Sequence, residues 1–555
     1  MILRICAALL VVLALSCRRD TFQSGGLLIW VPGGGAKQER IRALVAELGI
    51  PATFLGDREA VSISPRDLTS VQTVVCFDGP GGRALSSTAI PGLLRRRANL
   101  VLVGESAGIL GPSLGFQVVS SNETGFRWAE SVRPRLTPGS FDPASGQALV
   151  YGYGDKQVPG WRMTGNAGSP WVTDQVGRPR WTERALPAGG TLIAVAVPLA
   201  QLAVEGDSLQ ARILLERAAE LTGSPRLWPT PRGRGVMVVN IHIDGQSALP
   251  YLPALVRDWP PEVKGTFHIT AGPDCDRTGD SSGFSAQDPG KGGAWVLRLN
   301  ALGEVGSHGG WTHNLWAEEA GRWPWTKREE MLRLNADALA AAGPLRSYSS
   351  PSGLTPRDVY PWLESRGFTA YYTTGEAGGP PTRAWEKGAP CSRSMWAFPF
   401  TSLGAAAATY EFKKAGIPQA EVTGWLEKLL DYCESRREGR LVYGHAVDLG
   451  DMPKAYSGFL GALAGRSRNG TMASLTMQDY AAFLERRSRA TWSLEASGNR
   501  FVLKATGPSL RDLSFRIPGK WQLTTDPGLR LQANAQETWV TVLDDRTGLE
   551  VALWQ

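Results

Sequence analysis

Four of the five histidines in this 555-residue chain stand in three short segments, one of which also carries an aspartate. His242 and Asp244 belong to Val-Asn-Ile-His-Ile-Asp, His308 and His313 to Ser-His-Gly-Gly-Trp-Thr-His, and His445 ends Leu-Val-Tyr-Gly-His. One Asp and two His combine hard and borderline donors that suit zinc first, and also nickel or cobalt, with positions left for water and a substrate oxygen. A further histidine could handle protons. The pattern therefore indicates a metal site with acid–base chemistry beside it.

Strand-like runs that alternate with helical runs must position these residues between 236 and 487. Such alternation is typical of a barrel of parallel strands with outer helices, whose site collects at the carboxyl ends of the strands. His242 and Asp244, two residues apart on a strand, would point to the same face. The runs are Val236–Ile243, Gly265–Thr270, Tyr371–Thr374 and Leu441–His445 for strands, and Lys327–Ala342, Arg357–Arg366 and Gln419–Arg437 for helices.

On these segments the region resembles the polysaccharide deacetylase family, the family-four carbohydrate esterases. The resemblance implies a distorted (β/α) barrel that removes N- or O-acetyl groups from glycans with a divalent metal. It also implies that Asp244, His308 and His313 bind the metal and that His445 protonates the leaving group. Gly265-Thr-Phe-His-Ile resembles a strand of the family, and Glu304-Val-Gly-Ser precedes the histidine pair much as it does there.

Three departures from the family pattern bear on catalysis. The second Asp of the first motif, the general base, is missing, and His242 stands in its place as either a base or a fourth ligand. The histidine pair is spaced i and i+5 because Gly309 and Gly310 lengthen it, and glycine's conformational freedom could absorb the extra residue. The third motif appears as Ser349-Ser-Pro-Ser-Gly and lacks its arginine. His268 is expected to be a buried core histidine.

The first part of the chain, 26–222, alternates strand and helix in a way that predicts a parallel sheet covered by helices. Gly104-Glu-Ser-Ala-Gly has the spacing of a nucleophile elbow around Ser106. With Pro32-Gly-Gly-Gly and Phe77-Asp-Gly-Pro-Gly-Gly, it resembles the class I glutamine-amidotransferase-like superfamily, in particular the N-terminal type of biotin-protein ligases. No histidine precedes His242. The domain therefore cannot activate Ser106 and is predicted to be structural or ligand-binding.

The remaining segments complete an α/β multidomain chain. Residues 223–235 are rich in Pro and Gly and predict a linker, and 488–555 show short alternating runs that predict a small all-β, sandwich-like module. Residues 1–17 have the character of a signal peptide, and Leu15-Ser-Cys17 resembles a bacterial lipoprotein cleavage box. The expectation is export to the cell envelope with a lipid anchor on Cys17, or else simple secretion.

Composition narrows the remaining choices. A net charge of +7 without long basic runs gives no reason to expect nucleic acid as a partner. No CxxC motif supports a thiolate zinc site, while Cys275 and Cys391 could form a disulfide in an oxidising compartment. Asp448 and Asp451 could each orient His445 or be solvated loop charges, and we expect Asp451 to be solvated. Several tryptophans could stack on pyranose rings at the mouth of the site or pack the core; they are Trp311, Trp316, Trp323, Trp325, Trp385 and Trp396.

Taken together, the sequence predicts a metal-dependent deacetylase acting on an amino sugar of an exopolysaccharide or of peptidoglycan. Two alternatives stay open: a catalytically impaired, lipid-anchored glycan-binding scaffold, and a periplasmic amidohydrolase for a small amide. The sequence does not specify the glycan, the native metal or the oligomeric state.

Overall fold

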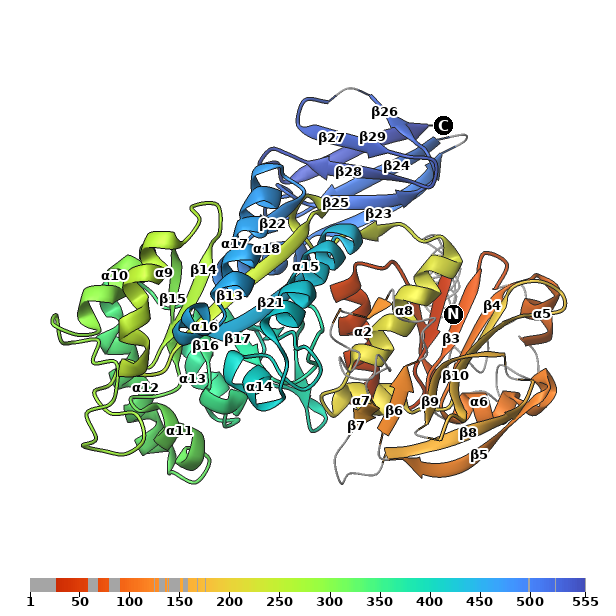
Figure 1. The fold of residues 1–555 in the computed structure, drawn as a ribbon. Coiled ribbons are helices and arrows are strands. Elements are labelled where there is room, and N and C mark those ends of the chain that lie inside the picture. Colours follow the sequence, from red (N-terminus) through yellow and green to blue (C-terminus); the bar gives the residue numbers. More distant parts are fainter. Residues whose placement is uncertain are drawn as a thin grey trace, which may run out of the picture.

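The computed structural model describes residues 26–57, 68–78, 90–123, 125–128, 135–136, 138, 150–152, 158–166, 168–174, 176–497, 500–524 and 526–554. They form an N-terminal α/β domain, a central barrel and a C-terminal β sandwich (Figure 1). The predicted signal segment, including Cys17, lies outside the described residues. Among the helices that the structure describes, none is long and apolar enough to cross a membrane.

The N-terminal domain is built on a mixed sheet in the order β2-β1-β3-β4-β11-β10-β9-β6-β7. The strands from β2 to β11 are parallel, and those from β10 onward are antiparallel. The predicted parallel sheet is thus only part of this sheet, because later strands such as β10 mix charged and apolar residues, as antiparallel strands do. Helices α2, α7 and α8 pack on one face, and α5 and α6 on the other. The bounds are β1 Leu27–Trp30, α2 Gly35–Leu48, β2 Thr53–Leu55, β3 Thr73–Cys76, α5 Ile90–Arg95, β4 Asn99–Val103, α6 Glu105–Leu110, β5 Phe116–Glu123, β6 Gly125–Trp128, β7 Val150–Gly152, β8 Val158–Gly165, β9 Ser169–Asp174, β10 Pro179–Ala185, β11 Thr191–Val195, α7 Leu199–Val204 and α8 Leu209–Thr222.

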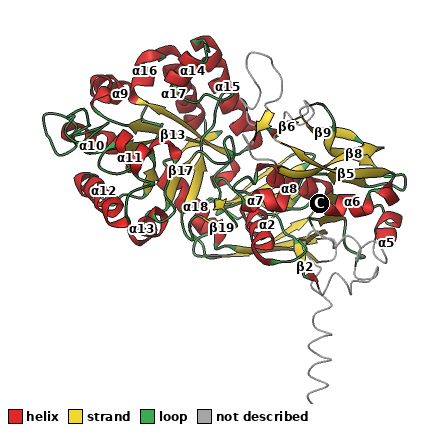
Figure 2. Ribbon diagram, turned by 90° about the horizontal axis from the view of Figure 1, so that it is seen from below, coloured by secondary structure: helices red, strands yellow, loops and turns green. Residues whose placement is uncertain are grey.

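The central domain is a barrel of parallel strands in the order β20-β17-β16-β15-β14-β13-β21, with β22 paired to β13. A parallel bridge between Phe400 and Leu441 joins the segment after β20 to β21 and nearly closes the ring. Figure 2 shows the helices arranged around these strands. The bounds are β13 Gly235–Ile243, α9 Leu252–Asp258, β14 Gly265–Ile269, α10 Gly293–Ala301, β15 Gly303–His308, α11 His313–Glu319, α12 Trp325–Ala338, β16 Ser347–Ser349, α13 Val359–Ser365, β17 Ala370–Thr373, β18 Trp385–Glu386, β19 Ala389–Pro390, β20 Trp396–Pro399, α14 Thr409–Lys414, α15 Gln419–Arg436, β21 Gly439–His445, α16 Ala446–Asp451, α17 Pro453–Arg468, β22 Met472–Ser474 and α18 Met477–Ser488.

The C-terminal module packs two antiparallel sheets, β12-β25-β28-β27 and β23-β24-β29-β26, on a core that it shares with α18 and the barrel strands. The predicted linker supplies β12 to the first sheet, and Trp228 and Thr230 within it are buried. The connection is therefore a packed element and not an exposed tether. The bounds are β12 Arg226–Leu227, β23 Thr491–Ser497, β24 Arg500–Thr506, β25 Ser514–Pro518, β26 Gln522–Leu523, β27 Leu529–Ala533, β28 Glu537–Val542 and β29 Gly548–Trp554.

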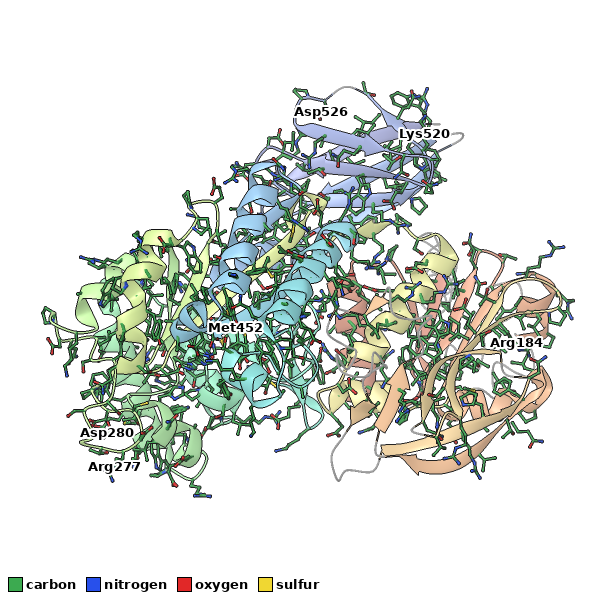
Figure 3. All side chains as sticks on the ribbon, in the orientation of Figure 1. Arg184, Arg277, Asp280, Met452, Lys520 and Asp526 are labelled. Atoms are coloured by element: carbon green, nitrogen blue, oxygen red, sulfur yellow. The ribbon has the colours of Figure 1, made fainter. Side chains whose placement is uncertain are left out.

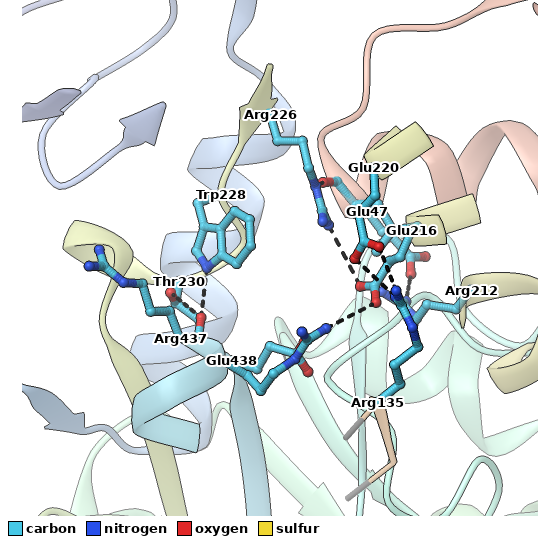
Figure 4. Close-up of polar contacts among 12 residues, drawn as sticks. Glu47, Arg135, Arg212, Glu216, Glu220, Arg226, Trp228, Thr230, Arg437 and Glu438 are labelled. Atoms are coloured by element: carbon cyan, nitrogen blue, oxygen red, sulfur yellow. Dashed lines mark hydrogen bonds and ion pairs between the residues drawn. The ribbon is translucent and has the colours of Figure 1, made fainter. Parts of the chain in front are cut away.

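Charged side chains fill the seam between the N-terminal domain and the barrel (Figure 4). On α8, Glu216 faces Arg226 at 3.6 Å and Arg436 of α15 at 3.8 Å. In the same region the indole of Trp228 donates to the carbonyl of Arg437 at 2.7 Å. Buried charges need such partners to offset the cost of leaving water. The seam is therefore a specific contact between the two domains.

Candidate metal centre

Strand β13 carries two predicted site residues to the carboxyl end of the barrel. Every residue of β13 is buried, and His242 lies beside His268 of β14 and His445 of β21 in the parallel register. Gly306 of β15 makes room for the His268 ring, since a Cβ there would lie 2.4 Å from that ring. His242, His268 and His445 therefore lie side by side on neighbouring strands, and Asp244 lies two residues further toward the carboxyl end of the barrel.

The second motif spans the end of β15 and the start of α11. His308 is the last residue of β15, and His313 is the first residue of α11. Gly309 has a φ of 65°, and a Cβ there would lie 2.5 Å from the Pro351 ring, so only glycine fits comfortably. This turn absorbs the longer spacing and brings His308 Nε2 and His313 Nε2 to 3.1 Å from each other.

The imidazoles converge on the carboxylate of Asp244. Its Oδ1 lies 3.2 Å from His308 Nε2 and 3.4 Å from His313 Nε2, and its Oδ2 lies 3.5 Å from His445 Nε2. Oδ1 is buried and makes no hydrogen bond of ordinary geometry within the described residues. Burial would raise the pKa of Asp244, but the surrounding histidines outweigh it and hold that pKa well below its ordinary value.

This donor set fits a divalent cation. Ligand atoms about 2.0–2.2 Å from a tetrahedral zinc stand about 3.3–3.6 Å apart, close to the separations among Asp244, His308 and His313. Donor atoms of His242, Asp244 and His308 also lie within 4.8 Å of one another. The residues present could therefore hold a metal, with His242 beside the three predicted ligands.

Two polar side chains in the barrel interior contact the ring of His242. Its Nε2 lies 3.0 Å from Asn240 Nδ2 and 3.2 Å from Ser349 Oγ. Asn240 Oδ1 in turn lies 2.8 Å from His268 Nδ1. Burial, followed by the neighbouring histidines, lowers the pKa of His242 well below its ordinary value, so the ring is neutral. His268 is completely buried, as expected, but it also takes part in the hydrogen-bond chain that orients His242.

His445 has a different electrostatic setting. Asp448 is buried, accepts the backbone N–H of His445 at 2.8 Å, and places Oδ2 3.4 Å from His445 Nδ1. Burial opposes a charge on this ring, yet Asp244 and Asp448 outweigh it and raise the pKa of His445 to about 9. Asp448 therefore orients His445. Asp451, expected to be solvated, forms an ion pair with Lys413 at 2.6 Å.

A cavity of about 190 Å³ opens onto this cluster and is lined by His242, Asp244 and His445. Tyr410 also lines it, with 61% of its surface exposed and its ring centre 6.1 Å from that of His445. The sequence reasoning missed Tyr410, because an exposed tyrosine between short segments gives no pattern.

The loop after β14 reaches the same end of the barrel, and Arg277 and Asp280 mark it beside α11 (Figure 3). Its Cys275 carbonyl accepts the N–H of Asn314 at 2.9 Å. Cys275 and Cys391 are both free thiols.

Four of the six tryptophans that could stack on sugar rings or pack the core are largely packed, and two of these four, Trp316 and Trp385, also line a cavity at the rim of the barrel. Trp316, Trp323, Trp385 and Trp396 are all buried.

The elbow-like turn of the N-terminal domain does not present a nucleophile. Ser106 is completely buried within α6, and its Oγ donates to the carbonyl of Phe77 at 2.9 Å. Asp78 nearby is also buried, and burial raises its pKa to about 7. Because all five histidines lie in the barrel, the structure offers no imidazole to Ser106.

No family model matches the sequence, and no curated protein matches it either. Among solved structures, the chain is similar to Agd3, described as a novel carbohydrate deacetylase, with 10% identity over 96% of this chain and 99% of that chain and a TM-score of 0.40. It is also similar to a family 4 carbohydrate esterase from Streptomyces lividans (12% identity, 43% of this chain, 91% of that chain, TM-score 0.27). A third is the polysaccharide deacetylase Bc1974 from Bacillus cereus (13% identity, 44% of this chain, 92% of that chain, TM-score 0.26). All three identities are 13% or lower, and all three TM-scores are 0.40 or lower.

Proposed function

We propose that the chain is a metal-dependent hydrolase that removes acetyl groups from an amino sugar of an envelope or extracellular polysaccharide. The observation that carries the proposal is the arrangement around Asp244, with His308 and His313 at one carboxylate oxygen and His445 at the other. Three segments far apart in the sequence meet there at the end of a parallel barrel. Such ends are where barrel enzymes place their chemistry.

The charge states of the site residues suit them to different roles in the reaction. Asp244, His308 and His313 would hold the metal, which polarises a carbonyl and makes water a stronger nucleophile. Neutral His242 lies beside them and would accept a proton at Nε2 in place of its hydrogen bond from Asn240. His445, kept charged by its carboxylate neighbours, is suited to donate a proton to the departing amine.

Ser349 and Asn240 take over the orienting role of the missing arginine. The carbonyl of Ser349 lies 3.2 Å from His308 Nδ1, and its hydroxyl lies 3.2 Å from His242 Nε2. Asn240 holds the same Nε2 from the other side. Partners of this kind fix ring orientation and typically matter about 10- to 100-fold for metal affinity or activity.

The test is metal analysis of purified protein combined with acetate release from acetylated amino-sugar polymers. The wild type is expected to carry one divalent ion and to release acetate, and His308→Ala to lose both. Asp337→Asn, which alters an exposed ion pair with Arg333 on α12 and no residue of the site cavity, is the matched control. Stoichiometric metal without acetate release from any polymer would overturn the proposal and favour the glycan-binding scaffold.

The cellular setting is a proposal from the sequence. We place the protein in the bacterial cell envelope, anchored by acyl chains on Cys17. Labelling with a radioactive fatty acid in cells should mark the wild type but not Cys17→Ala. Equal labelling of both would exclude this anchor.

A further inference from the structure

A second cavity, of about 570 Å³, lies on the rim of the barrel toward the N-terminal domain. Its volume falls within the range of about 300–1,000 Å³ typical of small-molecule sites. Trp316 forms one wall, and its indole also packs against the metal-centre turn, where a Cβ on Gly310 would lie 2.4 Å from that ring. Trp316 is three residues, or about 5 Å along α11, from His313. The cavity is therefore a direct neighbour of the metal centre.

Both domains build this cavity. Glu205 and Gly206, between α7 and α8, face β18, where a Cβ on Gly206 would lie 3.1 Å from the carbonyl of Trp385. Nearby, Arg40 is completely buried and donates to the carbonyl of Arg383 at 2.7 Å. It also pairs with Glu376 of the cavity wall at 3.2 Å. These contacts fix the N-terminal domain against the rim.

The lining combines acid with aromatic surface. Glu376 pairs with Arg40, but the carboxylates of Glu205, Glu318 and Glu386 also line the cavity. The lining contains one arginine, Arg322, and it pairs with Glu319. Of the carboxylates, the Glu386 side chain is 45% exposed and 3.5 Å from Lys387. This acidic lining stands out in a chain of net charge +7. The charged lining residues are Glu205, Glu318, Glu386 and Arg322, and Trp385 and Tyr360 supply aromatic surface.

One buried polar group points to a missing ligand. Tyr371 lines the cavity and is 1% exposed, and its hydroxyl has no hydrogen-bond partner of ordinary geometry among the described residues. The polar groups around it are Tyr360, Glu376 and the Cys391 thiol, and a thiol is a weak hydrogen-bond partner. Leaving a buried hydroxyl unsatisfied is costly, so such a group is commonly completed by a ligand or by water.

We propose that this cavity binds a sugar unit with a free ammonium group, next to the unit at the metal centre. Carboxylates recognise the ammonium, aromatic faces pack on the pyranose ring, and Tyr371 bonds a sugar hydroxyl. The proposal rests on the proposed function in one respect, the identity of the polymer. It assigns the N-terminal domain a role in completing the substrate site, and it favours partly deacetylated chains as substrates.

The test is calorimetric binding of a fully deacetylated glucosamine tetramer to the full chain, with a chelator present and at mildly acidic pH. The Glu318→Gln/Glu386→Gln double variant should bind about 5- to 25-fold more weakly, because each partly exposed ion pair contributes up to about fivefold. Glu330→Gln, exposed on α12 and away from the cavity, is the matched control and should bind as the wild type does. The neutral N-acetylated tetramer should bind similarly to all three proteins.

Tyr371→Phe gives a second measurement. The substitution removes only the unsatisfied hydroxyl, so a change in binding would not result from misfolding. It should leave the melting temperature unchanged or higher and weaken tetramer binding. Wild-type affinity in both cavity variants, or a loss of affinity only in Asp244→Asn, would overturn the proposal. Binding without acetate release would retain this site and reject the deacetylase, whereas acetate release without tetramer binding would do the reverse.

Discussion

Glu304 allows a quantitative test of how the barrel holds the strand that ends in His308. It is the second residue of β15, is 3% exposed, and its Oε2 accepts the N–H of Gln478 at the beginning of α18 at 3.0 Å. Its Oε1 makes no hydrogen bond of ordinary geometry among the described residues. Burial raises the pKa of Glu304 to about 7 from an ordinary value of 4.5, although hydrogen bonds from Ser347 and Gln478 oppose the shift. The folded protein therefore favours the protonated acid.

The sign and size of the effect follow from linkage. A raised folded-state pKa contributes stability that is fully present below 4.5 and is lost as pH rises through about 7. At about 1.4 kcal/mol per unit, the loss amounts to about 3 kcal/mol. Glu304→Gln keeps an acceptor for Gln478 but cannot ionise. It should therefore be more stable than the wild type above neutral pH, by about 1–3 kcal/mol, with the difference vanishing near pH 4.5.

Urea unfolding at several pH values measures this difference, and other titrating groups cancel when the variant is subtracted from the wild type. Glu330→Gln, on an exposed position of α12, should show no such difference. A constant offset between the Glu304→Gln variant and the wild type from pH 4.5 to above 7 would refute the reasoning.

Three further predictions concern the site. Gly309→Ala forces a side chain into a left-handed turn and against a proline ring 2.5 Å away, so metal affinity should fall at least about tenfold; Gly416→Ala, at a φ of 69° with open space, should keep full affinity in the same titration. Asp448→Asn should lower kcat about 10- to 100-fold with metal content unchanged, because His445 loses the carboxylate that orients it; unchanged kcat would reject that role. Tyr410→Ala should raise KM for a glycan about 2- to 10-fold without lowering the melting temperature, since the ring is exposed at the mouth, and an unchanged KM would show that it does not contact substrate.

The sequence predicted which side chains meet at the end of the barrel better than it predicted which residues surround them. His242 and Asp244 share a face because a strand alternates, and the observed β13 begins only one residue before the predicted run. The short strand Ser347–Ser349, which contacts His242, His268 and His308, is too short and polar for any periodicity to reveal. The buried tryptophans show the limit of composition, because an indole near the site in sequence packs the core as readily as it faces a ligand.

The contacts of the N-terminal domain suggest why a domain without a usable nucleophile accompanies the barrel. Glu47 of α2 bonds Thr382 Oγ1 at 2.7 Å and the N–H of Arg383 at 3.0 Å, which fixes the segment before β18. Ser208 donates to Glu376 at 2.8 Å from the same domain. These contacts tie the rim of the barrel to elements 168 to 336 positions away in the sequence. Removing Glu47 would take away the carboxylate that pairs with the buried guanidinium of Arg212 and the buried hydroxyl of Thr382, which costs more than the contacts contribute. The domain therefore acts as a fixed wall of the barrel's open end, and the geometry of that end depends on both domains.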